Sequence, residues 1–237
     1  MNGNQLLPQS VRIVAAEETA EEMHHEPPPE MMIATQIADV GPVLTRFMRD
    51  RFTPFDFSGI RLRFADQTFE GSMTLDVGGR EVRVLNLGPA HTHGDSIVHV
   101  PDAGVVYTGD LLFIGCTPIV WGSPISNWIK ACDTIIGLDA SAIVPGHGPV
   151  TDADGVRAVQ SYFRFVTEQA DAAHAKGLDF KAAAFGIDLG EYSTWLDSER
   201  VVVNIYQRYR EIDPGQPPVS QMALMGLMAK WDADRNR

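Results

Sequence analysis

Hydrophobic and polar positions along the chain predict a strand-rich segment that lies between two mostly helical ones. The N-terminal part has an apolar run over 11–14 that is suited to a buried strand, helix-forming residues over 17–25, and a helical composition over 31–52 that is broken at Gly41-Pro42. The central segment alternates between apolar and polar residues or runs apolar, which predicts strands over 61–64, 71–76, 81–87, 96–100 and 105–108. Glycine-containing turns at 77–80 and 101–104 predict two hairpins.

The rest of the chain is predicted to be largely helical. Ser123-Pro124 is the expected start of a helix, with the serine as cap and the proline in the first helical position. A short strand over 142–144 precedes the next helix, which we expect to be capped by Asp152 or Asp154 and to run to about residue 175. Further helices are expected over 198–211 and 221–231. The pattern indicates an α/β fold with a C-terminal helical extension.

Composition excludes several classes of function. The 237 residues carry a net charge of −12 and no basic stripe, so we expect no nucleic-acid partner. No apolar run is long enough for a membrane span, so no membrane association is expected. The two cysteines, Cys116 and Cys132, form no disulfide framework, which indicates a reducing compartment and hence a cytoplasmic location.

Three good metal ligands stand where strands are predicted to meet loops. His91 follows the strand over 81–87, Asp110 follows the strand over 105–108, and His147 follows the strand over 142–144. Imidazole and carboxylate groups on loops at the edge of a sheet are suited to a zinc-type site. The sequence therefore predicts that these three side chains converge around a metal.

These motifs together resemble a known family. The sequence GPAHT from Gly88, a hairpin, YTGD ending at Asp110 and PGHG from Pro145 occur in the order and spacing of metallo-β-lactamase-fold, metal-dependent hydrolases. The resemblance covers about residues 1–155 and implies an αβ/βα sandwich with one or two zinc ions at one edge; iron or manganese is less expected. It implies that His91 binds the first metal, that Asp110 bridges both and acts in catalysis, and that His147 binds the second.

One part of the family pattern is absent from the sequence. Such hydrolases supply four more ligands from an upstream His-x-His-x-Asp-His loop, and the string HTHGDS from His91 lacks the last histidine and precedes a predicted strand rather than a helix. The opening residues resemble the stretch that directly follows that loop. We therefore expect a chain truncated ahead of this motif, with N-terminal strands missing, an incomplete metal site, and an exposed sheet edge that favours a homo-oligomer.

Neighbouring residues complete the candidate site. His93 and Asp95 share the loop of His91 and are expected to be substitute ligands or to orient that imidazole. A substrate cleft is expected to include the aromatic residues that follow Asp110 and those of the helical extension, namely Phe113, Trp121, Tyr192 and Trp195. We expect a core over 1–155 and a helical extension over 156–237 packed on it.

Three functions follow as hypotheses. The first is a metal-dependent hydrolase in which metal-activated water attacks an ester-, thioester- or amide-like bond of a small molecule. The second is a non-catalytic remnant that acts as a binding or interaction scaffold. The third, an iron enzyme that handles oxygen or redox chemistry on this scaffold, requires the complete ligand set.

Overall fold

The computed structural model describes residues 2–122 and 124–235, which divide into two compact units. The first unit comprises Met1–Phe69 and Val219–Arg237, and the second comprises Glu70–Pro218. The expected boundary between residues 155 and 156 falls inside a helix of the second unit, so the division into a core and an extension stays a prediction.

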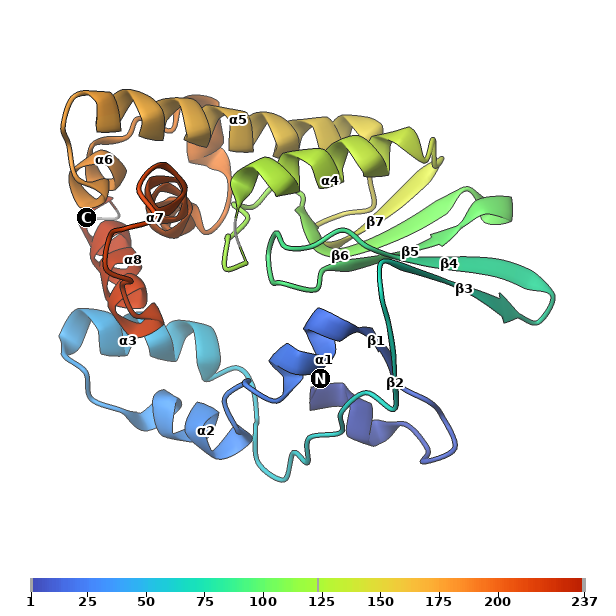
Figure 1. The fold of residues 1–237 in the computed structure, drawn as a ribbon. Coiled ribbons are helices and arrows are strands. Elements are labelled where there is room, and N and C mark those ends of the chain that lie inside the picture. The colour runs from blue at the N-terminus through green and yellow to red at the C-terminus, as the bar shows by residue number, and fades with distance from the viewer. Residues whose placement is uncertain (1, 123, 236–237) are drawn as a thin grey trace. The chain divides into compact units, whose positions relative to one another are not determined.

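The first unit combines one small sheet with helices (Figure 1). The strands β1 (Val14–Ala16) and β2 (Gln67–Phe69) pair in parallel, and α8 packs on α3. The other elements of this unit are η1 (Asn2–Leu6), α1 (Glu17–Met23), α2 (Pro29–Ile37), α3 (Pro42–Phe52) and α8 (Gln221–Arg235). The expected strand over 61–64 was wrong: that stretch is irregular, and the strand begins at Gln67 because pairing with distant Val14 decides its position.

The second unit is built on a five-stranded sheet with the order β3-β4-β5-β6-β7. Its strands are β3 (Ser72–Val77), β4 (Arg80–Asn86), β5 (Ser96–Val100), β6 (Val105–Phe113) and β7 (Ala142–His147). The first three pairs are antiparallel, whereas β6 and β7 are parallel. Gly78 and Gly79 form the β3–β4 turn with positive φ values of 64° and 84°, which only glycine adopts readily.

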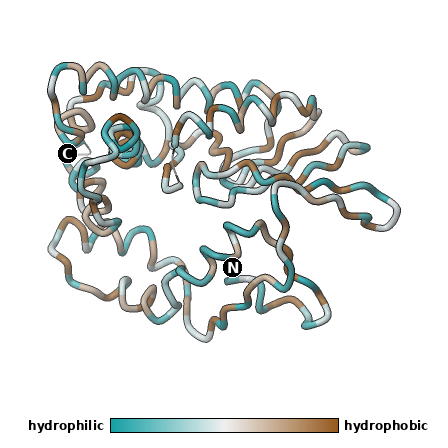
Figure 2. The backbone as a smooth tube through the Cα atoms, viewed as in Figure 1, coloured by the Kyte–Doolittle hydropathy of each residue, from teal (hydrophilic) through white to brown (hydrophobic). Residues whose placement is uncertain are grey.

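Helices α4 and α5 pack on each other and against β6, above one face of this sheet (Figure 1). The helices and short 3₁₀ turns are η2 (Pro101–Ala103), α4 (Ile125–Gly137), α5 (Ala153–Ala175), α6 (Phe180–Gly186), η3 (Gly190–Thr194), η4 (Ser198–Arg200) and α7 (Val201–Ile212). Hydrophobic and hydrophilic stretches interchange along α5, as expected for a helix with one buried face (Figure 2). The core of the unit contains Trp128, Tyr162 and Phe163.

The observed first residues of α4 and α5 can be compared with the predicted helix caps. Asp152 caps α5 by accepting a hydrogen bond from the backbone N–H of Asp154, as one of the two expected alternatives. The expected cap Ser123 lies outside the described residues. Pro124 is itself the residue before α4, so the prediction of proline in the first helical position was wrong by one residue. None of the helices in the described ranges is both long and apolar enough to cross a membrane.

His99 on β5 gives the second unit a pH-sensitive core position. The residue is only 6% exposed, it pairs with Arg83 and Val106 across the sheet, and its Nδ1 has no hydrogen-bond partner among the described residues. Burial, followed by the positive charge of Arg83, lowers the pKa of His99 below its ordinary value of 6.5, while Glu81 opposes the shift.

We therefore expect His99 to reduce stability in acid. Below about pH 6.5 the unfolded chain takes up a proton at this position that the folded chain resists, so the free energy of unfolding falls as the pH decreases. Above that pH both states hold a neutral ring and the contribution is constant. The variant His99→Leu should lose less stability than the wild type between about pH 6.5 and 5. Urea unfolding at a series of pH values measures this, and parallel curves would contradict the assignment.

Candidate metal centre

The three predicted ligands come from three different parts of the second unit. His91 lies in the loop between β4 and β5, Asp110 in β6, and His147 at the end of β7. Since β6 and β7 are parallel, their carboxyl ends lie at the same edge of the sheet. Asp110 is inside β6 rather than at its end, which corrects the expected strand-to-loop junction.

An irregular stretch of β6 presents Asp110 at this edge. The pairing of β6 with β7 shifts register on both sides of Gly109, which adopts a positive φ of 51°. Such bulges bend a strand and redirect a side chain. The position of Asp110 therefore depends on the local break in the ladder.

The structure brings the three side chains together around the Asp110 carboxylate. His91 Nε2 lies 3.5 Å from Asp110 Oδ2, and His147 Nε2 lies 3.5 Å from Asp110 Oδ1. The side chains are 16% exposed for His91, 41% for Asp110 and 48% for His147, so the cluster is reachable from solvent. Each imidazole thus faces a different oxygen of one carboxylate.

A hydrogen bond to the backbone sets the orientation of His91. Its Nδ1 lies 2.8 Å from the carbonyl oxygen of Ile119, which can only accept, so the neutral ring carries its proton on Nδ1. Nε2 then has a lone pair and faces a carboxylate oxygen that is also an acceptor. Two acceptors that face each other are an arrangement that a cation stabilises, and metal-binding histidines are commonly held in this way by their other nitrogen.

Buried aromatic rings support both imidazoles. Phe113 is 1% exposed and stacks on His147, with ring centroids 4.5 Å apart and planes 9° apart. Its centroid is 5.7 Å from that of His91, and the Trp128 ring meets His91 edge-on at 6.2 Å. Phe113 was expected in the substrate cleft, but its burial leaves almost no surface for a ligand and makes it a packing partner of the two histidines.

Asp95 organises the loop that carries His91. Its carboxylate accepts hydrogen bonds from the backbone N–H groups of Ala90 and Thr92 and from the Thr92 hydroxyl, at 2.8–3.1 Å. Burial raises the pKa of Asp95, and the hydrogen bonds from Thr92 and the nearby His91 oppose this shift. His93 lies in the same loop. Direct ligation by either residue stays a prediction.

The other expected cleft residues occupy two places. The backbone N–H of Trp121 donates to the carbonyl of His91 at 2.9 Å, so Trp121 adjoins the site. Tyr192 and Trp195 contact each other and Tyr162, with centroids 5.1–5.4 Å apart, in an aromatic cluster. Their contact with a substrate stays a prediction.

Arg200 is a neighbour of the site that the sequence motifs did not predict. Its guanidinium carbon lies 5.5 Å from the centre of the Phe113 ring, and it pairs with Asp197 at 2.9 Å. Arg200 stands far from the motifs in sequence and in a short 3₁₀ turn, so no local signal marks it.

Within the residues that the structure describes, no group of three or more His, Cys, Asp or Glu side chains is arranged to hold one metal ion. The cluster supplies one imidazole and one carboxylate oxygen at each of two positions. These donors amount to half of the usual four-coordinate zinc set at each position.

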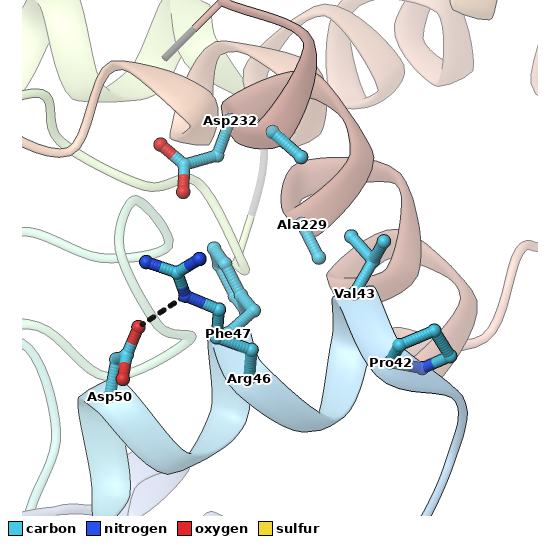
Figure 3. A pocket seen from close by; sticks show the side chains of 8 residues that line it. Pro42, Val43, Arg46, Phe47, Asp50, Ala229 and Asp232 are labelled. Carbon is cyan, nitrogen blue, oxygen red and sulfur yellow. Dashed lines mark ion pairs between the residues drawn. The ribbon is translucent and has the colours of Figure 1, made fainter. Parts of the chain in front are cut away.

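A hollow in the first unit has different chemistry. It lies between α3 and α8, has a volume of about 450 Å³ and is lined partly by Val43, Phe47 and Ala229 (Figure 3). Its polar side contains Arg46, whose Nε lies 3.6 Å from Asp50 Oδ2. The described residues that line it include neither histidine nor cysteine, so it does not offer the ligands of a zinc-type centre.

Comparison with curated proteins finds short, distant relatives. The chain is 29% identical over 89 residues to the 2,4-dinitroanisole O-demethylase subunit alpha of Nocardioides sp. (strain JS1661). It is 32% identical over 92 residues to a probable metallo-hydrolase of Bacillus subtilis (strain 168), and 33% identical over 84 residues to the hydroxyacylglutathione hydrolase of Brucella ovis. Each match covers 35–37% of this chain, but only 26%, 43% and 32% of the respective relatives, less than half of each.

Solved structures share the fold at low identity. A metallo-beta-lactamase family protein from Thermus thermophilus superposes with a TM-score of 0.57 at 14% identity, over 90% of this chain and 70% of that one. A double mutant of a sec-alkyl sulfatase gives a TM-score of 0.58 at 12% identity, over 87% of this chain and 37% of that one.

A family model decides the classification. The model of the metallo-beta-lactamase superfamily matches residues 1–147, more than half of the chain and a range that includes all three predicted ligands. Proteins of this superfamily generally bind metal ions and act on small molecules. With this match and the shared fold, the chain belongs to the metallo-beta-lactamase superfamily.

Proposed function

We propose that this protein is a metal-dependent hydrolase in which His91, Asp110 and His147 are metal ligands. The observation that carries the proposal is the convergence of three side chains: the Nε2 atom of each histidine lies 3.5 Å from a separate oxygen of the Asp110 carboxylate. The Ile119 carbonyl accepts from His91 Nδ1, which favours the tautomer that leaves Nε2 free to bind a cation.

The spacing of these donors suits a divalent cation. Two ligands on a tetrahedral zinc ion, each at about 2.1 Å, lie about 3.4 Å apart. The measured 3.5 Å between imidazole nitrogen and carboxylate oxygen is close to this value at both positions. The residues therefore fit zinc as pairs of donors, and the proposed site is incomplete at each position.

The proposed chemistry is hydrolysis by water. When bound, a zinc-type cation lowers the pKa of a water so that it ionises near neutral pH. The cation also polarises the bond to be cleaved. Asp110 places its carboxylate between the two imidazoles and would help to hold a cation bound by them. The buried ring of Phe113 packs against both histidines and that of Trp128 against His91, which restricts the orientation of the imidazoles.

The class of bond is part of the proposal. One relative is named a hydroxyacylglutathione hydrolase, which supports a thioester among the candidate substrates, and ester- and amide-like bonds complete the set. We further propose a reducing, cytoplasmic setting, since Cys116 and Cys132 are buried free thiols.

A binding scaffold without catalysis is the second candidate. It is favoured by the lack of a group of three suitable ligands among the described residues. Such a scaffold would bind a ligand or a partner chain with no stoichiometric metal and no turnover.

Metal analysis of the purified protein separates the two candidates. We expect zinc in near-stoichiometric amount after incubation and dialysis, and we expect His91→Ala to weaken zinc binding at least about 100-fold, because loss of one of two donors at a position removes half of its protein ligands. Inductively coupled plasma mass spectrometry gives the stoichiometry and also reports iron and manganese. A panel of chromogenic ester, thioester and lactam substrates then tests turnover.

The control is His25→Ala, which removes an exposed imidazole outside the cluster. This variant should bind zinc as the wild type does. Equal zinc loss in both variants, or a wild type that binds no metal, would reject the hydrolase in favour of the scaffold.

A further inference from the structure

Helix α7 and the turn before it present a polar stripe to the segment that follows β6. The stripe consists of Arg200, Asn204, Gln207 and Glu211, and their spacing of four, three and four residues places them on one helical face. Helix α7 packs on α5 within the second unit (Figure 1). Polar residues on a largely buried helix require hydrogen-bond partners.

Each residue of the stripe binds the backbone of residues 117–125, in order along the chain. Arg200 donates to the carbonyl of Thr117 at 2.9 Å, and Gln207 reaches the carbonyl of Trp121 at 3.4 Å. Glu211 accepts from the N–H of Ile125, the first residue of α4, at 2.6 Å. The helix thus holds the described part of the connection between β6 and α4.

Asn204 is the buried centre of this arrangement. Its side chain has no solvent exposure, and its Oδ1 accepts from the N–H of Val120 at 3.0 Å. Its Nδ2 donates to the carbonyl of Pro118 at 2.9 Å and to the hydroxyl oxygen of Tyr162 at 2.8 Å. The two backbone contacts lie on either side of Ile119 and fix the peptide groups next to it.

Ile119 is the residue whose carbonyl holds His91. The carbonyl lies 2.8 Å from His91 Nδ1, and the N–H groups of Trp121 and Gly122 donate to the His91 carbonyl at 2.9 Å. The segment over 118–122 therefore forms hydrogen bonds with α7 and also with His91. The contacts form an unbroken chain from Asn204 to the imidazole.

We propose that Asn204 is a positioning residue of the metal centre, which sets the tautomer and orientation of His91 through the backbone of residues 118–120. The consequence for metal binding rests on the proposed function, whereas the effect on the imidazole does not. Residues that orient a ligand from behind typically change metal affinity about 10–100-fold when they are replaced.

The test compares Asn204→Leu with Tyr162→Phe. The first variant removes both backbone contacts, and the second removes only the hydroxyl that Asn204 also contacts. In metal-free protein at about pH 8, where imidazoles are ordinarily neutral, the ¹⁵N chemical shifts of His91 report which nitrogen carries the proton. We expect a single Nδ1–H form in the wild type and in Tyr162→Phe, and a mixture of tautomers in Asn204→Leu. Zinc affinity should fall about 10–100-fold in Asn204→Leu and change less than about 3-fold in Tyr162→Phe.

Wild-type ¹⁵N shifts of His91 in folded Asn204→Leu would overturn the proposal. If that variant does not fold, Asn204→Ser carries the same comparison, because serine is smaller and its hydroxyl is too short to reach both Pro118 and Val120. Altered tautomers together with a wild type that binds no zinc would retain the positioning role and reject the metal-dependent function.

Discussion

Gly146→Ala is expected to disrupt the candidate metal centre without removing any of its ligands. A Cβ atom at residue 146 would collide with Oδ1 of Asp110 and lie 2.6 Å from the carbonyl carbon of Gly109. The backbone of Gly109 forms part of the β6–β7 ladder and cannot move aside without breaking it. The carboxylate that both histidines face would therefore be displaced.

Two measurements should show the effect of Gly146→Ala. The free energy of unfolding should fall by about 3 kcal/mol, at the upper end of the usual cost of overpacking. Zinc affinity should fall about 100-fold, as for loss of a residue that orients a ligand. Urea unfolding and competition with a chromogenic chelator provide the two values.

Gly137→Ala is the matched control for this substitution. Gly137 is the last residue of α4, and a Cβ atom there would meet nothing within 4 Å. The control should bind zinc as the wild type does and be equally stable or slightly more stable, because alanine favours a helix over glycine. If Gly146→Ala matched this control in zinc affinity, Asp110 would not depend on the close approach of β7.

Trp128→Ala is expected to destabilise the second unit strongly. Trp128 has no exposed surface, its ring centroid is 4.5 Å from that of Phe163 on α5, and its Nε1 donates to the carbonyl of Leu111 at 2.9 Å. Its replacement should lower the free energy of unfolding by about 3–5 kcal/mol, since it opens a large cavity. Such a loss is a large fraction of the stability of an ordinary domain.

Urea unfolding followed by far-ultraviolet circular dichroism measures this loss, and two further variants serve as comparisons. Trp128→Phe keeps an aromatic ring but removes the indole N–H that donates to the Leu111 carbonyl, so an intermediate loss of about 1–3 kcal/mol is expected. Leu196→Ala, at a side chain that is 69% exposed, should stay within about 0.5 kcal/mol of the wild type. Equal stability of Trp128→Ala and Leu196→Ala would show that α4 contributes little to the fold.

Local signals accounted for the elements that the sequence predicted well. The helix expected from Asp152 or Asp154 to about residue 175 is observed as α5, Ala153–Ala175, because its cap and its apolar stripe lie within the element itself. The β3–β4 hairpin was equally predictable, since its two glycines determine the turn. The strand β2 was misplaced because only its pairing with β1, far away in sequence, defines it.

The residues of the candidate site also fall into those that local motifs identify and those that only the fold identifies. His91, Asp110 and His147 could be named from their motifs, and so could the participation of Asp95 in the loop, because each motif lies within a few residues. The roles of Arg200 and Asn204 could not, since a helical pattern shows which residues share a face but not which distant backbone that face meets.

The sequence by itself determined which side chains could bind a metal, which segments are helical and which family the motifs resemble. Tertiary structure alone decided that two imidazoles face opposite oxygens of one carboxylate, through the parallel register of β6 and β7 and the break at Gly109. It also decided that α7 holds the segment that orients His91. The physical reason is that capping, turns and periodicity act over a few residues, whereas strand register and side-chain contacts join residues that only folding brings together.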